Sequence, residues 1–510
     1  MIEDQVSNLS RENSAPELTI AKNAGFGLGG SLITVLVRLT ISIVITRSIG
    51  HESFGVYILA IAIVSVAEII ALLGMENTVV KFVSQFRSLN DAPRLRGTIF
   101  WGIGLVLALS SLICAGLFCI SHFLGYHIFD KPPLVHILKI MALSLPFSSP
   151  GKVLTASLQG IKLVKYKALV QQVLIPFFRL VCVVSAIALG YRLTGIAWSY
   201  VMAEVLGIMC SGYFLFKSFP EIRQKSPSIY EARKITFFSL PLLFSGMFNR
   251  IVARADILIM GHYLSATMVG IYGVARRCLP LIIMPLGAFN SIFAPVISDL
   301  FARKKKKDLE TQFKTVAKWV FMTSLPIFTL LTFFSKQILS IFGPGFAAGS
   351  LSMMILCIGQ MVNAATGSVG FMLMMTGRPF ADLLNSGLLC VINVLLNIYL
   401  IPRYGIVGAA CASAFSITAI QLLRLVEVWY FLRMHPYRWD FLKPVFSGLF
   451  AVVMVTMISH SGMSIAGMFR LPILVTLFLL SYVGFLWLLK LSPEDHIVLN
   501  GLRRKLGYLD

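Results

Sequence analysis

The sequence predicts an all-α membrane protein with many transmembrane helices. Of its 510 residues, 57% are hydrophobic and only 13% are charged. The mean hydropathy of +0.83 lies far above that of a soluble protein. Apolar runs of about 20 residues or more recur along most of the chain, and a run of this length can cross the hydrocarbon core as a helix. The length of the chain is therefore a guide to the number of membrane helices rather than to the number of soluble domains.

The apolar runs predict fourteen crossings, and several of them contain proline. Proline kinks a membrane helix rather than ending it, because neighbouring groups satisfy the freed carbonyls. The expected crossings are residues 24–46, 55–80, 98–121, 134–158, 166–189, 195–216, 236–262, 268–300, 317–342, 347–375, 382–401, 406–432, 444–462 and 468–489.

The distribution of Lys and Arg predicts the orientation of these crossings. The N-terminus and every second connection hold 29 of the 44 basic residues, and the other connections hold 6. By the positive-inside rule, both termini are expected in the cytoplasm. Residues 1–23 lack the pattern of a secretory signal, so we expect the first helix to start insertion. The basic run Arg303–Lys307 and the net charge of +22 are interpreted as topology anchors near anionic lipid, not as a nucleic-acid site.

Two parts of the chain resemble each other. TRSIGHESFGVYILA (46–60) aligns with GHYLSATMVGIYGVA (261–275) at an offset of 215, and LGMEN (73–77) aligns with LGAFN (286–290) at an offset of 213. Six helices per half preserve the direction of insertion, so the halves are expected to be parallel repeats about an axis along the membrane normal. The predicted units are a cytoplasmic tail (1–23), a six-helix bundle (24–217), a cytoplasmic linker (218–235), a second six-helix bundle (236–432), helices thirteen and fourteen (443–490) and a cytoplasmic tail (491–510).

Charged residues inside the predicted crossings are mostly basic. Such charges are costly in the bilayer and usually face a protein interior or a watery cavity. Lys152 and Lys336 are expected to extend towards the headgroups, and Arg424 and Glu427 are expected to form a local ion pair. The basic residues are Arg38, Lys152, Arg179, Arg250, Arg254, Arg276, Arg277, Lys336 and Arg424, and the acidic ones are Glu68, Glu76, Glu204, Asp256 and Glu427.

The repeat places arginines at related positions in the two halves. Arg38 and Arg254 are separated by 216 residues, close to the repeat offset, and Arg250 shares a helical face with Arg254. Asp256 is rotated about 160° from Arg254 by the helical period, so we do not expect it to neutralise that face. If the helices flank a central cleft, their arginines converge on it. The alternative is that each arginine pairs with Glu68, Glu204, Asp256 or a backbone carbonyl.

A deep cationic cleft between two halves suits an anionic solute. Arginine stays charged and offers a planar fork of donors that matches phosphate, so a diphosphate is a good candidate. Rocking of the two halves would carry such a headgroup across the membrane while an apolar tail stayed in lipid.

The hairpin DILIMGHYLSATMVGIYGVA (256–275), with its counterpart ITRSIGHESFGVYILA (45–60), resembles the polysaccharide-transporter flippases. These belong to the multidrug/oligosaccharidyl-lipid/polysaccharide exporter superfamily. The resemblance implies export of an undecaprenyl-diphosphate-linked oligosaccharide across the bacterial inner membrane, for O-antigen, capsule or exopolysaccharide assembly. It also implies that helices thirteen and fourteen help to accommodate the lipid tail, and that glycan polymerase and chain-length proteins are potential partners.

By the same resemblance, Arg38, Arg250 and Arg254 match the arginines that hold the diphosphate. Arg179, Arg276, Arg277 and Asp256 are further candidates for the cavity, and Glu68 and Glu204 are candidates for ion coupling. The sequence is sparse in acidic groups, which puts a carboxylate-based proton or sodium site in doubt.

Two other functions fit less well. A cation-coupled multidrug exporter of the same superfamily needs carboxylates, and the excess of arginine would repel its cargo. A membrane glycan polymerase or ligase needs catalytic residues in an outward loop, but the longest outer connection, 122–134, is short. No metal-ligand spacing, phosphate-binding glycine loop or nucleophile elbow occurs, so no enzymatic activity, cofactor or metal is expected.

Overall fold

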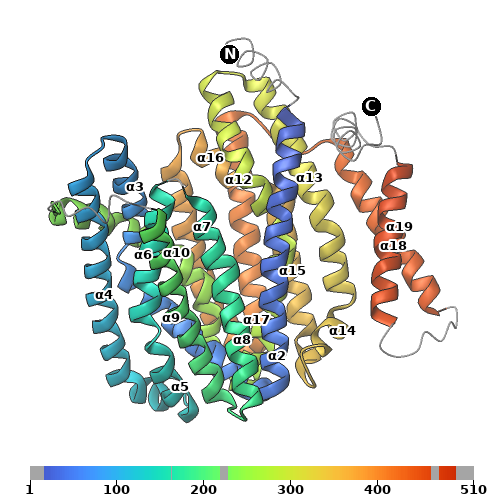
Figure 1. Ribbon diagram of the computed structural model, residues 1–510. Coiled ribbons are helices and arrows are strands. Elements are labelled where there is room, and N and C mark those ends of the chain that lie inside the picture. The colour runs from blue at the N-terminus through green and yellow to red at the C-terminus, as the bar shows by residue number, and fades with distance from the viewer. Residues whose placement is uncertain (1–15, 162, 219–227, 461–469, 490–510) are drawn as a thin grey trace.

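The computed structural model describes residues 16–161, 163–218, 228–460 and 470–489. Within these ranges every regular element is a helix, as the composition predicts (Figure 1). Nine helical segments of this part are long and apolar enough to cross a membrane, or ten if the pair α5 and α6, bent by 43°, is one span. The predicted tails, 1–23 and 491–510, lie largely or wholly outside the described residues.

The helices follow the order of the predicted crossings, although several crossings consist of more than one element. The elements of the first half are α2 (Pro16–Leu72), α3 (Met75–Ser88), α4 (Ala92–Phe123), η1 (Leu124–Ile128), α5 (Pro132–Ala142), α6 (Leu145–Gly160), α7 (Val164–Ala168), η2 (Leu169–Leu174), α8 (Ile175–Ala188) and α9 (Leu193–Ser218). The remaining elements are α10 (Ala232–Tyr263), α11 (Ala266–Cys278), α12 (Pro280–Ala302), α13 (Lys306–Phe333), α14 (Ser335–Ser340), η4 (Phe346–Gly349), α15 (Ser350–Thr366), α16 (Val369–Met375), α17 (Pro379–Leu432), η5 (Trp439–Phe441), α18 (Leu442–His460) and α19 (Arg470–Leu488).

Two very long helices, α2 and α17, each turn sharply at a glycine. Gly50 has φ 74° and Gly405 has φ 58°, a backbone conformation that glycine adopts at little cost. Each glycine therefore divides one continuous element into two helices. The divisions fall between the first and second predicted crossings, and between the eleventh and twelfth.

Five predicted crossings are divided between consecutive helices. The crossing at 134–158 divides between α5 and α6, and that at 317–342 divides between α13 and α14. The crossing at 55–80 breaks at Leu73–Gly74, where both residues have positive φ. The crossing at 268–300 divides between α11 and α12 beside Pro280. The crossing at 347–375 divides between α15 and α16 at Gly367, whose φ is 67°. Positive φ and proline both remove the regular helical hydrogen bonds, and the apolar pattern does not register this.

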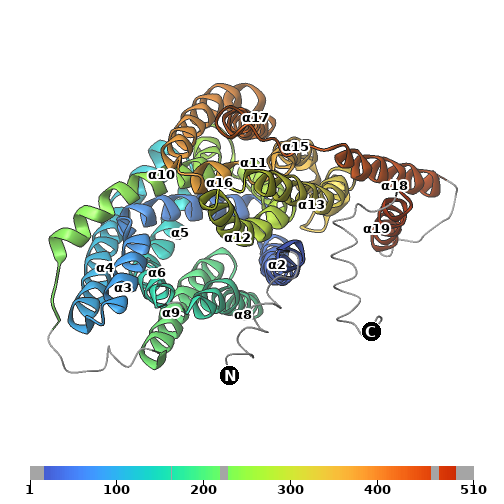
Figure 2. The ribbon, with the colours of Figure 1, turned by 90° about the horizontal axis from the view of Figure 1, so that it is seen from above.

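The last two helices stand beside the rest of the molecule. In Figure 1 the red helices α18 and α19 lie at the right edge, and the view in Figure 2 places them beside α13. Phe478 and Tyr482 of α19 and Val455 of α18 form a small apolar cluster there with Phe334.

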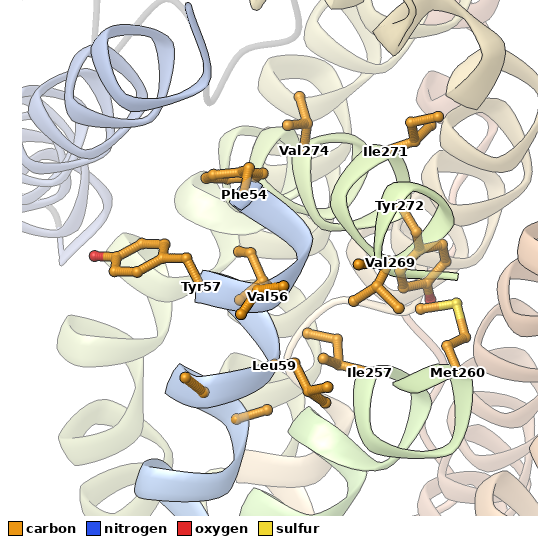
Figure 3. Close-up of a cluster of buried hydrophobic side chains, with 14 of the residues drawn as sticks. Phe54, Val56, Tyr57, Leu59, Ile257, Met260, Val269, Ile271, Tyr272 and Val274 are labelled. Atoms are coloured by element: carbon orange, nitrogen blue, oxygen red, sulfur yellow. The ribbon is translucent and has the colours of Figure 1, made fainter. Parts of the chain in front are cut away.

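The largest apolar core joins the two copies of the sequence repeat. Figure 3 shows Phe54, Val56 and Leu59 of α2 facing side chains of α10 and α11. At the centre of this contact the second helix of one repeat meets the equivalent helix of the other. A Cβ atom on Gly55 would overlap the Ala266 carbonyl oxygen, and a Cβ atom on Gly270 would overlap the His51 carbonyl oxygen. The absence of side chains at both positions allows the two backbones to touch.

Candidate functional site

A cavity of about 560 Å³ lies beside this contact. Its walls come from α2, α6, η2, α8, α9, α10, α11 and α12. The polar and charged residues that line it are Arg38, Ser42, Tyr57, Ser148, Lys152, Thr155, Gln171, Arg179, Tyr200, Glu204, Ser211, Arg254, Arg276 and Arg277.

Five of these lining residues are arginines, and two of the five have a carboxylate partner. Arg179 donates to Glu204 at 2.8 Å and stacks over the Tyr200 ring, 4.1 Å from its centroid. Arg276 donates to the Asp256 carboxylate, and also to the Ala253 carbonyl oxygen at 2.8 Å. Because each ion pair cancels one positive charge, these two arginines add little net charge to the cavity.

The other three arginines of the lining, Arg38, Arg254 and Arg277, have no carboxylate within 4.0 Å in the part of the chain that the structure describes. Arg277 donates to the Ser42 hydroxyl and lies 5.0 Å from the centre of the Phe54 ring. Arg277 lines the same cavity as Arg254 and Arg38, so three positive charges face one space. This surplus of positive charge in a low-dielectric site is unfavourable unless an anion enters.

Arg38 and Arg254, which the repeat relates, line the same cavity from α2 and α10. Arg250 does not line it. Its side chain is 40% exposed and lies 3.9 Å from Glu68 and 4.0 Å from Glu76. One turn of helix therefore separates Arg254 in the cavity from Arg250, which faces acidic groups of the other half.

Asp256 is buried away from the cavity lining, with 1% of its surface exposed. It accepts hydrogen bonds from the Tyr272 hydroxyl at 2.8 Å and from the Ile257 backbone at 2.8 Å, as well as from Arg276. The helical period correctly excludes Asp256 as a partner of Arg254. Its side-chain partners, Tyr272 and Arg276, lie on α11, and no spacing in the sequence identifies them.

Two predictions about individual charges are wrong. Lys152 does not reach the headgroups but donates to Glu68 at 2.5 Å. Arg424 does not pair with Glu427, because the two halves of α17 fold back beside each other and bring Asp382 to 2.7 Å from Arg424. In both cases a partner from another helix replaces the expected local arrangement, since hydrogen-bonded pairing is favoured where water is scarce.

At one end of the molecule the two halves are joined by direct contacts, and we call this the sealed end. Beyond the Gly55–Gly270 contact, Lys131 donates to the carbonyl oxygen of Gly261 at 2.6 Å and to that of Phe129 at 2.8 Å. His262 lies 2.6 Å from the Ile128 carbonyl oxygen.

A bundle of apolar helices around a charged internal cavity defines a multi-pass membrane protein of the transporter class. Residues 20–301, more than half of the chain, match the family described as "Polysaccharide biosynthesis protein". The chain belongs to this family. Residues 241–399 also match the MatE family.

Relatives with similar sequences carry names of transporters and flippases. A "Putative O-antigen transporter" of Shigella flexneri is 23% identical, and the match covers 82% of this chain and 99% of that protein. The "Lipopolysaccharide biosynthesis protein WzxC" of Escherichia coli K12 is 21% identical over 76% of this chain and 74% of its own. A "Probable low-salt glycan biosynthesis flippase Agl15" of Haloferax volcanii is 26% identical, but the match covers only 39% of this chain and 42% of that protein.

Solved structures share the fold at low sequence identity. The structure described as "Lipid II flippase MurJ, inward closed conformation" has a TM-score of 0.72 and 14% identity, covering 90% of this chain and 97% of its own. An inward-facing multidrug transporter of the MATE family has a TM-score of 0.68 and 15% identity, covering 81% and 98%. The expected family resemblance is therefore confirmed.

Proposed function

We propose that this protein is a flippase. It moves an undecaprenyl-diphosphate-linked oligosaccharide from the inner to the outer leaflet of the cytoplasmic membrane, for O-antigen, capsule or exopolysaccharide assembly. The names of the relatives support this function. The observation that carries it is a group of three arginines in the cavity, Arg38, Arg254 and Arg277, which have no carboxylate partner among the described residues.

In this mechanism the three arginines hold the diphosphate. Guanidinium groups donate bidentate, charge-assisted hydrogen bonds to phosphate oxygens, and these bonds are stronger in a site shielded from water. The anion would also relieve the repulsion among the arginines. Arg250 acts nearer the cytoplasm, where its long contacts with Glu68 and Glu76 leave it free to meet an incoming headgroup. Arg179 and Arg276, already paired with carboxylates, hold the surrounding walls in place.

The proposed topology has fourteen crossings, two six-helix bundles and both termini in the cytoplasm. The two sharp turns in α2 and α17 and the excess of basic residues in alternate connections support this count. The sealed end then faces outward, and the cavity receives its cargo from the cytoplasmic side. Rocking of the halves would separate the Gly55–Gly270 contact and open the outer end. The lipid tail would remain in the bilayer, next to α18 and α19.

The test is headgroup binding by the purified protein in lipid nanodiscs. Arg254→Ala should weaken binding of a polyprenyl diphosphate by about ten- to a hundredfold, since charge-assisted hydrogen bonds contribute about 1.5–3 kcal/mol. Arg254→Lys should restore only part of it, because lysine lacks the planar fork. Arg192→Ala, on an exposed connection outside the cavity, is the matched control. Equal affinity in wild type, Arg254→Ala and an Arg38→Ala/Arg254→Ala double variant would overturn the proposal.

A cation-coupled multidrug exporter is the second candidate, because residues 241–399 match the MatE family. Such a protein needs an available carboxylate in its cavity. Glu204 is engaged by Arg179 and Glu68 is engaged by Lys152, so each candidate for ion coupling already has a cationic partner. Efflux of a cationic dye from vesicles, abolished by Glu204→Gln and unaffected by Arg254→Ala, would favour this second function over the flippase.

A further inference from the structure

The cavity has two chemically different walls. The arginines without carboxylate partners come from α2, α10 and α11, whereas the wall formed by α6, η2 and α9 is polar but nearly neutral. This second wall, which we call the first-half wall, consists of Ser148, Lys152, Thr155, Gln171, Tyr200 and Glu204.

The charges of the first-half wall are already matched. Lys152 lies 2.5 Å from Glu68, and Glu204 lies 2.8 Å from Arg179, which reaches it from α8. Within the described part of the chain, both cations that touch this wall are paired with carboxylates, so the wall carries little net charge. Each pair nevertheless keeps unused donor or acceptor positions, because a carboxylate has about four lone-pair sites and an ammonium has three N–H groups.

An amide and a hydroxyl complete this wall. Gln171 donates through Nε2 to the Thr155 hydroxyl oxygen at 2.8 Å, which fixes the orientation of the amide. The same Thr155 hydroxyl donates to the Lys152 carbonyl oxygen at 3.0 Å. Gln171 therefore presents its carbonyl oxygen and its second N–H as a fixed acceptor and donor on the cavity surface. Fixed neutral donors and acceptors of this kind recognise hydroxyl and amide groups.

The size of the cavity restricts what these groups can contact. Cavities of about 300–1,000 Å³ hold a ligand of drug size, and this one has about 560 Å³. A diphosphate on the arginines and the sugar attached to it would fill this space. Sugars further along the chain would lie outside the cavity, so the first-half wall meets only the sugar next to the diphosphate.

We infer that the first-half wall is the binding subsite for the sugar bonded directly to the diphosphate, and that it selects an uncharged, hydroxyl- or acetamido-bearing sugar over a uronic acid. This inference rests on the proposed function. A uronate carboxylate would lose its water beside Glu204, whose partner Arg179 is already engaged, and desolvation without a new cation opposes binding. An uncharged sugar would satisfy Gln171 and the free positions of the two ion pairs.

The experiment compares three ligands on the purified protein in nanodiscs. These are a polyprenyl diphosphate without sugar, the same lipid with one N-acetylhexosamine, and the same lipid with one hexuronic acid. Wild-type protein should bind the N-acetylhexosamine lipid about tenfold tighter than the sugar-free lipid, and the hexuronic acid lipid no tighter than the sugar-free one. Gln171→Ala should remove the tenfold advantage and leave sugar-free binding unchanged, which also shows that the variant is folded.

Gln159→Ala is the matched control. Gln159 lies on α6 like Thr155, but it accepts from Lys167 at 2.8 Å and does not line the cavity. This variant should keep the full sugar advantage. Two results would overturn the subsite: a tenfold advantage of the N-acetylhexosamine lipid that persists in Gln171→Ala, or binding of the hexuronic acid lipid that is tighter than that of the sugar-free lipid. In either case the proposed function would stand as long as binding of the sugar-free lipid still depends on Arg254. A different result would overturn the proposed function instead. That result is a wild-type protein that does not bind the sugar-free lipid, or an Arg254→Ala variant that binds it as tightly as wild type does.

Discussion

Gly55 and Gly270 occupy equivalent positions of the sequence repeat and lie against each other where the two halves meet. The contact is reciprocal, because a Cβ atom on Gly55 would lie 3.0 Å from the Gly270 nitrogen, and one on Gly270 would lie 3.0 Å from the Gly55 nitrogen. Their other close neighbours, Ala266 and His51, are also separated by the repeat offset. The local axis that relates the repeats therefore passes between these two glycines, next to the cavity.

A methyl group at this contact should force the halves apart. Gly55→Ala or Gly270→Ala places a side-chain atom against a backbone carbonyl that cannot move aside, and overpacking of this kind costs about 1–3 kcal/mol. We expect a lower melting temperature in detergent for both variants. Gly116→Ala, at a helical position of α4 where a Cβ atom meets nothing within 4 Å, should leave the melting temperature unchanged or raise it slightly. A normal melting temperature for Gly55→Ala would show that the halves do not touch there.

Lys131 should stabilise the closed outer end. Its ammonium group links the two halves through Gly261, and Lys131→Met would leave that buried carbonyl and the Phe129 carbonyl without this donor. Val269 is fully buried in the closed contact. An impermeant maleimide added outside should therefore label Val269→Cys faster in the Lys131→Met variant than in the parent protein. The measurement uses a background without native cysteines. Lys139→Met, a partly buried lysine on α5, should label as slowly as the parent.

The same lysine gives the closed state a dependence on pH. Burial lowers the pKa of the Lys131 ammonium, although nearby Asp130 opposes the shift. The closed state therefore binds this proton less tightly than an open state with the amine in water. Closure should become more favourable as pH rises towards the ordinary pKa of lysine. The measurement is the ratio of two labelling rates at Val269→Cys, one with Lys131 present and one in the Lys131→Met background. This ratio should fall as pH rises. A ratio that rises with pH would contradict the role of Lys131.

Asp256 and Arg276 should depend on each other for stability. Arg276→Met leaves a carboxylate that is 1% exposed without its cation, and breaking a buried pair in this way costs about 3–5 kcal/mol. The double variant Asp256→Leu/Arg276→Met removes both charges and should recover most of the lost thermal stability. Arg303→Met breaks an exposed pair with Asp299 and should have little effect. Additive losses in the double variant would show that the two residues act independently.

The sequence could predict much of the fold because its signals are local. Apolar runs located the helices, and the match between 46–60 and 261–275 marked two equivalent segments, which the structure brings into contact. The breaks at Gly74 and Gly367 could not be predicted, because an apolar run looks the same whether its backbone is continuous or turned by a positive φ.

The site was predictable only in part, for a physical reason. The offset between Arg38 and Arg254 placed both on equivalent helices, and both line the cavity. Whether a charge has a partner depends on contacts across helices, and these leave no pattern in one chain. Hence Arg250 was expected in the cavity but faces Glu68, and Arg277 was a minor candidate although it has no carboxylate partner among the described residues.

A carboxylate introduced into the cavity should pair with the arginines and compete with the substrate. Ser42 lines the cavity and accepts a hydrogen bond from Arg277, so Ser42→Asp puts a negative charge beside that guanidinium. The new ion pair would compete with the diphosphate, and we expect binding of sugar-free polyprenyl diphosphate to weaken by about tenfold or more, which corresponds to about 1.4 kcal/mol. Ser42→Asn has nearly the same shape without the charge and should bind within about twofold of wild type. Equal binding by Ser42→Asp and Ser42→Asn would show that Arg277 does not meet the diphosphate, and the role in binding would then rest with Arg38 and Arg254.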